Sequence, residues 1–313
     1  MPPNPKNFSA ASIPTLNNLV YIVTGGNTGI GYITCLELAR KGALVYMASR
    51  SRDRGMAAIE KIKKETGKNV EFLQLDLQDL KQVQQAAKDF LKLDKPVDCL
   101  VNNAGIMACP FSLTKDGIES QFGTNHVGHF LFTKELMPAI LKANNPRIVN
   151  VSSSYHNKAP LPEGIRFDHI NDEKNMNNWQ RYGQSKLANI LFTRGLHKRF
   201  GDKVYCNVIH PGFVDTELIR GPVESAGVFA PVLSFVLKGV KMAVALTPDQ
   251  GALTQLYCAT SEDIEKENIR NKFFVPIASM VEPELEDLAS DEKLADQLWE
   301  YSENLVKEKL GLE

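Results

Sequence analysis

The sequence predicts an α/β fold, in which one doubly wound, seven-stranded parallel sheet carries helices on both faces. Short runs rich in β-branched residues alternate along the chain with amphipathic stretches of helical length. This alternation is typical of a parallel sheet whose strands are joined by crossover helices. No internal repeat and no low-complexity linker interrupts it. We therefore expect a single domain over residues 19–313, preceded by an irregular lead-in at 1–18 that is held loosely against the body.

The individual elements follow from these patterns. The runs that we assign to strands are Leu19–Thr24, Ala43–Ala48, Val70–Leu75, Val97–Asn102, Arg147–Ser152, Lys203–His210 and Lys272–Pro276. The stretches that we assign to helices are Gly29–Lys41, Asp53–Glu65, Leu80–Leu91, Ile118–Lys142, Trp179–Phe200 and Pro248–Thr260. A further helix is expected at about 290–310, where apolar residues recur near helical spacing. Its expected role is to cover the body of the domain.

The composition excludes several classes of protein. The 36 basic and 37 acidic residues leave a net charge of -1, which offers no electrostatic footprint for nucleic acid. The five cysteines are scattered and never spaced as CxxC, which favours reduced thiols over disulfides or a zinc site. The first residues lack the apolar stretch of a secretory signal. These features predict a cytoplasmic protein.

One segment raises the question of a membrane. Residues 228–246 are the most apolar part of the C-terminal half, but Lys238 and Lys241 interrupt them. The segment is too short and too charged to span a bilayer, so we expect no integral membrane segment. A helix at a membrane surface, or one that caps an apolar pocket, remains open.

A glycine-rich turn follows the first strand directly and leads into the first helix. Its glycines are spaced GxxxGxG, which lets the backbone turn tightly and approach a pyrophosphate at the N-terminus of a helix. The residues that we expect beside the phosphates are Gly25, Asn27, Thr28, Gly29, Ile30 and Gly31. The alternative is that the glycine-rich turn is only a tight connection and binds no ligand. Its position between the first strand and the first helix argues against this alternative.

The end of the second strand indicates which dinucleotide is bound. A protein that prefers NAD usually carries a carboxylate there, which bonds the ribose 2′-hydroxyl. Here the strand is followed by Arg50, and no carboxylate occurs before Asp53. Arg50 is placed to pair with a 2′-phosphate, which favours NADP(H) over the alternative that it only solvates the start of a helix. Asp76 and Leu77, at the end of the third strand, are expected near the adenine.

The glycine-rich turn and five further motifs make the sequence similar to the short-chain dehydrogenase/reductase family over about residues 19–260. The segments that carry the resemblance are TGGNTGIG at 24–31, NNAG at 102–105, TNHVGHF around Asn125, VSSS at 151–154, YGQSK at 182–186 and PGFVDT at 211–216, in the family's order. Within the family the sequence resembles the retinol-dehydrogenase-like and fungal carbonyl-reductase-like members, through NTGIG, NHVGHF, RIVNVSS and SKLANILFT. The resemblance implies a Rossmann fold and an NADP(H)-dependent oxidoreductase that transfers hydride between the nicotinamide and a carbonyl or alcohol.

Tyr182 and Lys186 are the strongest catalytic candidates. They lie four residues apart in a predicted helix, so both point from the same face. A free tyrosine has a pKa of about 10, and a neighbouring ammonium together with an oxidised nicotinamide would favour its phenolate. The YxxxK spacing alone is common by chance, and it gains its meaning from the other motifs.

The resemblance implies the roles of the remaining site residues. Ser153 would hold the substrate oxygen against Tyr182, Lys186 would bind the nicotinamide ribose, and Asn125 would fix a water that relays protons. Ser152 or Ser154 could replace Ser153, and Asn125 could be only a helix cap. The cofactor would be bordered further by Asn103, Ala104, Gly105, Pro211, Gly212, Val214 and Thr216. His126 and His129 lie on one helical face, but no carboxylate or cysteine is spaced to complete a site, so we expect no metal.

The substrate is less well defined by the sequence. The segment between Ser154 and Arg181 is longer than in many family members, and it contains Phe167, Met176 and Trp179. With a lid at about 217–247 it would enclose an apolar or aromatic ketone, aldehyde or alcohol, unless both segments only pack together. The alternatives are a catalytically retired nucleotide-binding sensor or scaffold and a sugar-nucleotide epimerase. A homodimer through the helices of Asn125 and Tyr182 is implied by the family alone.

Overall fold

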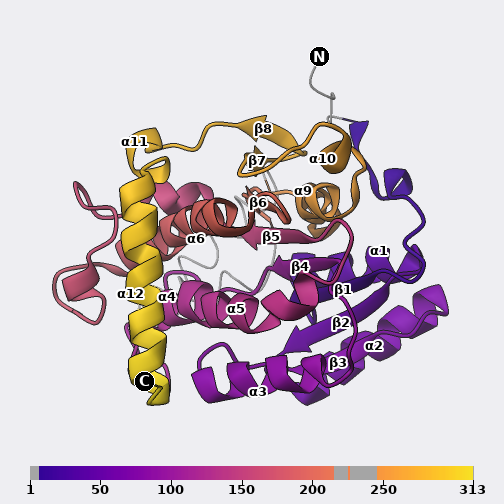
Figure 1. Ribbon diagram of the computed structural model, residues 1–313, viewed down its shortest axis with the longest axis horizontal. Coiled ribbons are helices and arrows are strands. Elements are labelled where there is room, and N and C mark those ends of the chain that lie inside the picture. The colour runs from indigo at the N-terminus through magenta and orange to yellow at the C-terminus, as the bar shows by residue number, and fades with distance from the viewer. Residues whose placement is uncertain (1–6, 215–224, 226–244, 313) are drawn as a thin grey trace.

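The computed structural model of the protein describes residues 7–214, 225 and 245–312. At its centre lies one eight-stranded sheet with the strand order β3-β2-β1-β4-β5-β6-β7-β8 (Figure 1). The strands are β1 (Val20–Thr24), β2 (Leu44–Ser49), β3 (Glu71–Gln74), β4 (Cys99–Asn102), β5 (Arg147–Val151), β6 (Tyr205–Ile209), β7 (Phe273–Val275) and β8 (Ser279–Val281). The first seven pair in parallel, and β8 pairs antiparallel with β7. The predicted fold class is confirmed.

Helices cover both faces of the sheet because alternate strand residues point to opposite sides. In β1, Tyr21 and Val23 face one apolar core, whereas Val20 and Ile22 face the other. The first core is closed by α1 (Gly29–Arg40), α2 (Arg52–Thr66) and α9 (Pro248–Thr260). The second core is closed by α3 (Leu80–Leu91), α5 (Gly128–Ile140), α6 (Asn178–Phe200) and α12 (Glu292–Leu310).

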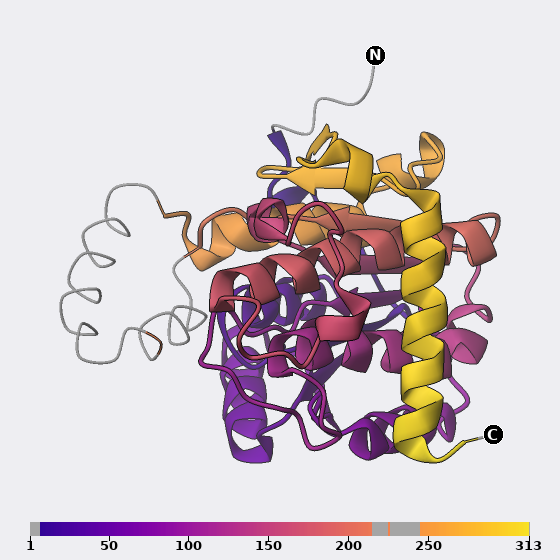
Figure 2. The same ribbon diagram turned by 90° about the vertical axis from the view of Figure 1, so that its left-hand side faces the viewer.

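The helix α12 lies across the outside of the second layer, as Figure 2 shows. Its Trp299 ring packs 5.0 Å from the Phe130 ring on α5 and 5.9 Å from the Phe192 ring on α6. Its Ser302 hydroxyl lies 2.8 Å from Nε2 of the buried His126. The tail helix therefore completes the core of this layer. In the described ranges, no helix has the length and apolarity needed to cross a bilayer.

Two elements differ from the sequence prediction. The helix expected at Ile118–Lys142 consists of α4 (Ser120–Phe122), a π-helical turn at Gly123–Val127, and α5. In a π-helical turn each hydrogen bond spans one more residue than in an α-helix, and the spacing of apolar residues in the sequence does not show this local change. The eighth strand, β8, was not predicted because it is three residues long and mostly exposed, so it shows no alternation of apolar and polar residues.

The N-terminal lead-in also packs more closely than predicted, as far as the structure describes it from residue 7 onward. Ile13 and Leu16 are buried in the first core. The Leu16 N–H donates to the Lys41 carbonyl over 2.8 Å, and the Phe8 ring meets the Tyr257 ring edge-on. Ile13 and Leu16 are therefore part of the core, which corrects the expectation that the segment is held loosely.

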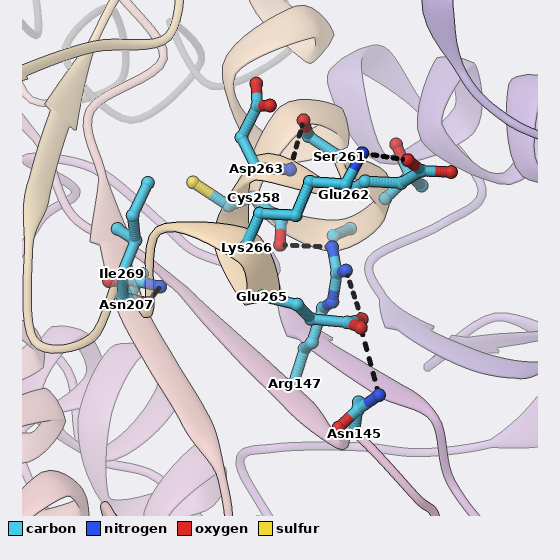
Figure 3. Close-up of polar contacts among 12 residues, drawn as sticks. Asn145, Arg147, Asn207, Cys258, Ser261, Glu262, Asp263, Glu265, Lys266 and Ile269 are labelled. Carbon is cyan, nitrogen blue, oxygen red and sulfur yellow. Dashed lines mark hydrogen bonds and ion pairs between the residues drawn. The ribbon is translucent and has the colours of Figure 1, made fainter. Parts of the chain in front are cut away.

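A buried arginine supports the sheet at the amino end of β5, away from the strand ends that carry the glycine-rich turn. Figure 3 shows its polar contacts. Arg147, the first residue of β5, donates to Glu265 over 2.7 Å and to the Cys258 carbonyl over 3.4 Å. Asn145 donates to the other oxygen of Glu265 over 2.9 Å. The Arg147 side chain is 8% exposed and that of Glu265 is 37% exposed. Glu265 thus neutralises a charge that has little access to water.

Replacing Glu265 by Ala should therefore destabilise the fold. Breaking a buried ion pair leaves one charge unpaired, and partial exposure of Glu265 reduces the cost to about 2 kcal/mol of unfolding free energy. Urea denaturation measures it. The matched control is Glu262→Ala, which removes an exposed pair with Lys266 and should leave stability nearly unchanged. Equal effects of both substitutions would contradict this account.

Candidate active site

The glycine-rich turn connects β1 to α1 at the carboxyl end of the sheet. Gly25 and Gly29 have φ of +66° and +55°, values that side chains rarely allow. A Cβ at Gly31 would collide with the Gly25 carbonyl oxygen and with the Asn103 side chain. Thr28 precedes α1 without a side-chain capping bond, so the first N–H groups of that helix remain available. The turn therefore has the open backbone that a phosphate needs.

The NNAG segment is bonded directly to this turn. The N–H groups of Asn103 and Ala104 both donate to the Thr24 hydroxyl over 2.9 Å, and the Asn103 amide donates to the Thr24 carbonyl over 2.8 Å. A Cβ at Gly105 would lie 3.2 Å from Asn125 Oδ1 and 3.4 Å from Lys186 Nζ. The segment thus joins the turn to the catalytic candidates.

Arg50 and Asp76 follow the ends of β2 and β3 on the same edge of the sheet. Arg50 is exposed, and its side chain makes no hydrogen bond or ion pair with any residue in the described part of the chain. Asp76 is half-buried and accepts from the Gln78 N–H over 3.0 Å, while Leu77 is buried. Arg50 is therefore free to meet an anionic ligand.

The four catalytic candidates come together in the second layer, and all are buried. Lys186 Nζ lies 5.7 Å from the centre of the Tyr182 ring and donates to the Val151 carbonyl over 3.0 Å. Ser153, just after β5, lies near enough to the Tyr182 hydroxyl to lower its pKa. Asn125 lies in the π-helical turn, bonded to both backbone groups of Ile106.

The geometry distinguishes the three consecutive serines. Ser152 donates to the Lys186 carbonyl over 2.8 Å, which gives it a structural contact with α6. Ser154 begins the 3₁₀ turn η4 (Ser154–Lys158). Ser153 accepts from the Tyr155 N–H over 3.2 Å and faces Tyr182. This arrangement favours Ser153 as the residue that would hold a substrate oxygen.

Burial sets the charge states of Tyr182 and Lys186. Burial raises the pKa of Tyr182 to about 12, and the neighbouring Ser153 hydroxyl lowers it only in part. Burial lowers the pKa of Lys186 to about 7. Lys186 together with an oxidised nicotinamide is expected to lower the Tyr182 pKa, but in the protein alone burial acts in the opposite direction and raises it. In the protein without ligand, Tyr182 therefore keeps its proton at neutral pH.

Replacing Lys186 by Met should stabilise the cofactor-free protein, on the order of 3 kcal/mol below pH 7, because no charge is then buried. Between pH 7 and 10.5 the unfolded wild type binds more protons than the folded one, so wild-type stability rises with pH. The advantage of the variant should shrink over this window. Unfolding at several pH values measures it, with exposed Lys68→Met as control. A difference in unfolding free energy between variant and wild type that does not depend on pH would contradict the lowered pKa of Lys186.

The two histidines beside Asn125 are held by protein partners. His129 Nε2 lies 2.8 Å from the Thr24 hydroxyl, and its Nδ1 lies 3.0 Å from the Asn125 carbonyl. His126 contacts Ser302 instead, and burial lowers the pKa of both rings, to about 3 for His126 and about 4 for His129. No group of three or more metal-binding side chains occurs in the ranges that the structure covers.

Sequence reasoning missed one residue of the site and could place others only in part. Ser185 accepts from the Asn125 amide over 2.9 Å and donates to the Tyr182 carbonyl over 2.8 Å. Its position next to Lys186 in YGQSK is the signal that could have found it. At the end of β6, Gly212 has φ of +88°, and Val214 forms an isolated β-bridge with Leu246. Thr216 and nearly all of the predicted lid lie outside the described residues.

A parallel sheet with a glycine-rich βα turn, beside a buried serine, tyrosine and lysine, defines a nicotinamide-dependent oxidoreductase. Residues 19–165 match the family described as short chain dehydrogenase. An oxidoreductase of Schizosaccharomyces pombe is 37% identical, over 97% of this chain and 90% of its own. Retinol dehydrogenase 12 of Mus musculus is 38% identical over 97% of this chain and 92% of its own length. A crystal structure from Mycobacterium Paratuberculosis has a TM-score of 0.75 at 33% identity and covers 96% and 97%. The chain belongs to the short-chain dehydrogenase/reductase family and is retinol-dehydrogenase-like.

Proposed function

We propose that the protein is an NADP(H)-dependent carbonyl reductase or alcohol dehydrogenase, which reduces an apolar or aromatic ketone or aldehyde. The observation that carries the proposal is the contact between Ser153 and Tyr182 beside the Lys186 amine, next to the NNAG segment and the glycine-rich turn. A buried phenol that keeps its proton is suited to protonate an oxygen on which negative charge develops.

The cofactor-binding part of the proposal rests on the shape of the turn. Gly31 lets the start of α1 lie directly against the Gly25 carbonyl and the Asn103 side chain, which holds the turn in place, and the uncapped start of α1 offers N–H groups to a pyrophosphate. The free guanidinium of Arg50 suits the 2′-phosphate of NADP(H). When bound, the nicotinamide supplies the hydride for the carbonyl carbon.

The chain's own residues would then position the substrate and move a proton. Ser153 donates a hydrogen bond to the carbonyl oxygen, and Tyr182 gives that oxygen its proton as the charge develops. Lys186, held by the Val151 carbonyl, lies close enough to Tyr182 to stabilise the phenolate that remains. Asn125 is bonded through Ser185 to the backbone of Tyr182, so it fixes the helix that carries the acid.

Several broader expectations belong to the same proposal. They are a single domain with a substrate lid at about 217–247, a cytoplasmic location that suits the free cysteines, and a small-molecule partner. Pairing with a second copy also stays a prediction. Because α12 packs on α5 and α6 within the chain, a dimer through these helices would need the part of their surface that α12 leaves open.

The loss of NADPH absorbance in the presence of aliphatic, aryl and dicarbonyl substrates tests the proposal, with NADH run alongside. We expect turnover with NADPH and little with NADH. Tight binding of NADPH without turnover on any substrate would favour the sensor or scaffold alternative. Equal turnover with both cofactors would contradict the choice of NADP(H).

A further inference from the structure

A row of three aromatic rings begins at the proposed acid. The Tyr155 ring lies 6.1 Å from the Tyr182 ring, at an interplanar angle of 56°. On its other side Tyr155 stacks on Trp179, with ring centroids 4.7 Å apart and planes only 24° from parallel. The backbone N–H of Tyr155 donates to the Ser153 hydroxyl. The row is therefore tied to both residues that would hold the substrate oxygen.

The backbone around the row fixes its position. Tyr155 lies in η4 and Trp179 at the start of α6, and the two elements meet at Gly183. A Cβ on Gly183 would lie 2.6 Å from the Ala159 nitrogen and 2.7 Å from the Tyr155 carbonyl oxygen. Only glycine lets η4 lie this close to α6. The Asn177 cap, which accepts from the Trp179 N–H over 3.0 Å, holds the other end of the row.

The row runs from the interior to the surface. Tyr182 is 2% exposed, whereas Tyr155 and Trp179 are 36% and 37% exposed. The stacked pair thus leaves aromatic surface in contact with water beside a buried acid. A ligand that covered this surface would gain both apolar burial and the specific attraction between stacked rings.

We propose that Tyr155 and Trp179 form an aromatic subsite that selects substrates whose carbonyl carbon bears a flat aromatic or conjugated group. The inference rests on the proposed function, which places the carbonyl oxygen at Ser153 and Tyr182. The group attached to that carbonyl then extends past Tyr155, the side chain that contacts Tyr182 and continues to open surface. A flat ring can stack on this pair, whereas a puckered aliphatic ring of the same size cannot.

Two ketones of the same carbon skeleton test the subsite, namely acetophenone and cyclohexyl methyl ketone. The quantity to compare is the ratio of their kcat/KM values in each enzyme, because the intrinsic reactivity of the ketones cancels between enzymes. Tyr155→Leu and Trp179→Leu should each lower the aryl-to-alkyl ratio roughly fivefold. Tyr155→Phe, which keeps the ring, should retain the wild-type ratio. The control is Tyr205→Leu at the opposite end of the sheet, where the Arg270 guanidinium lies over the ring.

A binding measurement tests the subsite without turnover. The chain has two tryptophans, so Trp299→Phe leaves Trp179 as the only one. With NADP⁺ bound, acetophenone should change the Trp179 fluorescence saturably, and cyclohexyl methyl ketone should do so at least fivefold more weakly. Equal responses to the two ketones would overturn the subsite.

The failures of the two proposals are distinguishable. A wild type that reduces both ketones, with a ratio that stays within about twofold in both leucine variants, overturns the aromatic subsite and leaves the reductase intact. A wild type that reduces no carbonyl compound overturns the proposed function, and the fluorescence titration then decides whether Trp179 binds flat rings.

Discussion

Replacing Tyr182 by Phe should lower kcat by roughly a hundredfold or more, while the affinity for NADPH changes little. The substitution removes one oxygen and keeps the ring that packs in the buried site. The loss would then report the proton that the phenol is proposed to supply, because Ser153 is proposed to contribute only a hydrogen bond. Steady-state kinetics with a responsive ketone measures kcat, and equilibrium titration measures NADPH binding.

A matched control separates this effect from the loss of any buried hydroxyl. Tyr21→Phe removes a buried hydroxyl that bonds the Ala259 carbonyl on the other side of the sheet. It should leave turnover close to that of the wild type. Activity of Tyr182→Phe within a few-fold of wild type would show that Tyr182 is not the acid.

Arg50→Ala should weaken NADPH binding about 30-fold and leave NADH binding almost unchanged. The guanidinium would lose charge-assisted hydrogen bonds to a 2′-phosphate that NADH lacks. Because the exposed Arg50 side chain makes no hydrogen bond or ion pair in the described ranges, its removal breaks no polar contact there. Titration of both cofactors against wild type and variant measures the difference.

Arg52→Ala is the control for the charge of this region. The Arg52 guanidinium lies over the Phe72 ring, 5.5 Å from its centre, so its position is already determined by the protein. We expect a smaller loss of NADPH affinity from this variant. Equal losses of NADPH and NADH binding in Arg50→Ala would exclude a 2′-phosphate contact.

The sheet could be predicted because its strands are short, apolar and bounded by turns. The run Leu19–Thr24 became β1 with a change of one residue, and the expected start of α6 at Trp179 moved to Asn178. In both places a local signal sets the boundary, namely the glycine-rich turn after Thr24 and the capping box of Asn177 with Gln180. An element boundary can be predicted from sequence where nearby residues, such as a glycine-rich turn or a helix cap, determine it.

What could not be predicted depends on the packing of distant segments. The π-helical turn that carries Asn125 shows no change of apolar spacing in the sequence. The direction in which the Tyr182 pKa shifts depends on how completely the site excludes water, and a sequence motif does not show whether a residue is buried. The stack of Tyr155 on Trp179 joins residues from two elements whose contact is set by Gly183. The motifs locate the candidates, and tertiary structure sets their chemistry.

The contact between α12 and the π-helical turn has a consequence for how the chain is made. His126 meets Ser302 across 176 positions of sequence, and Phe130 and Phe192 are covered by Trp299. A ribosome synthesises the chain from its N-terminus, so these aromatic side chains remain uncovered until translation has passed α12. The sheet and the glycine-rich turn can form earlier. We expect nascent chains that stop short of α12 to expose this apolar surface and to be recognised by chaperones, so that newly made enzyme matures only after α12 has docked.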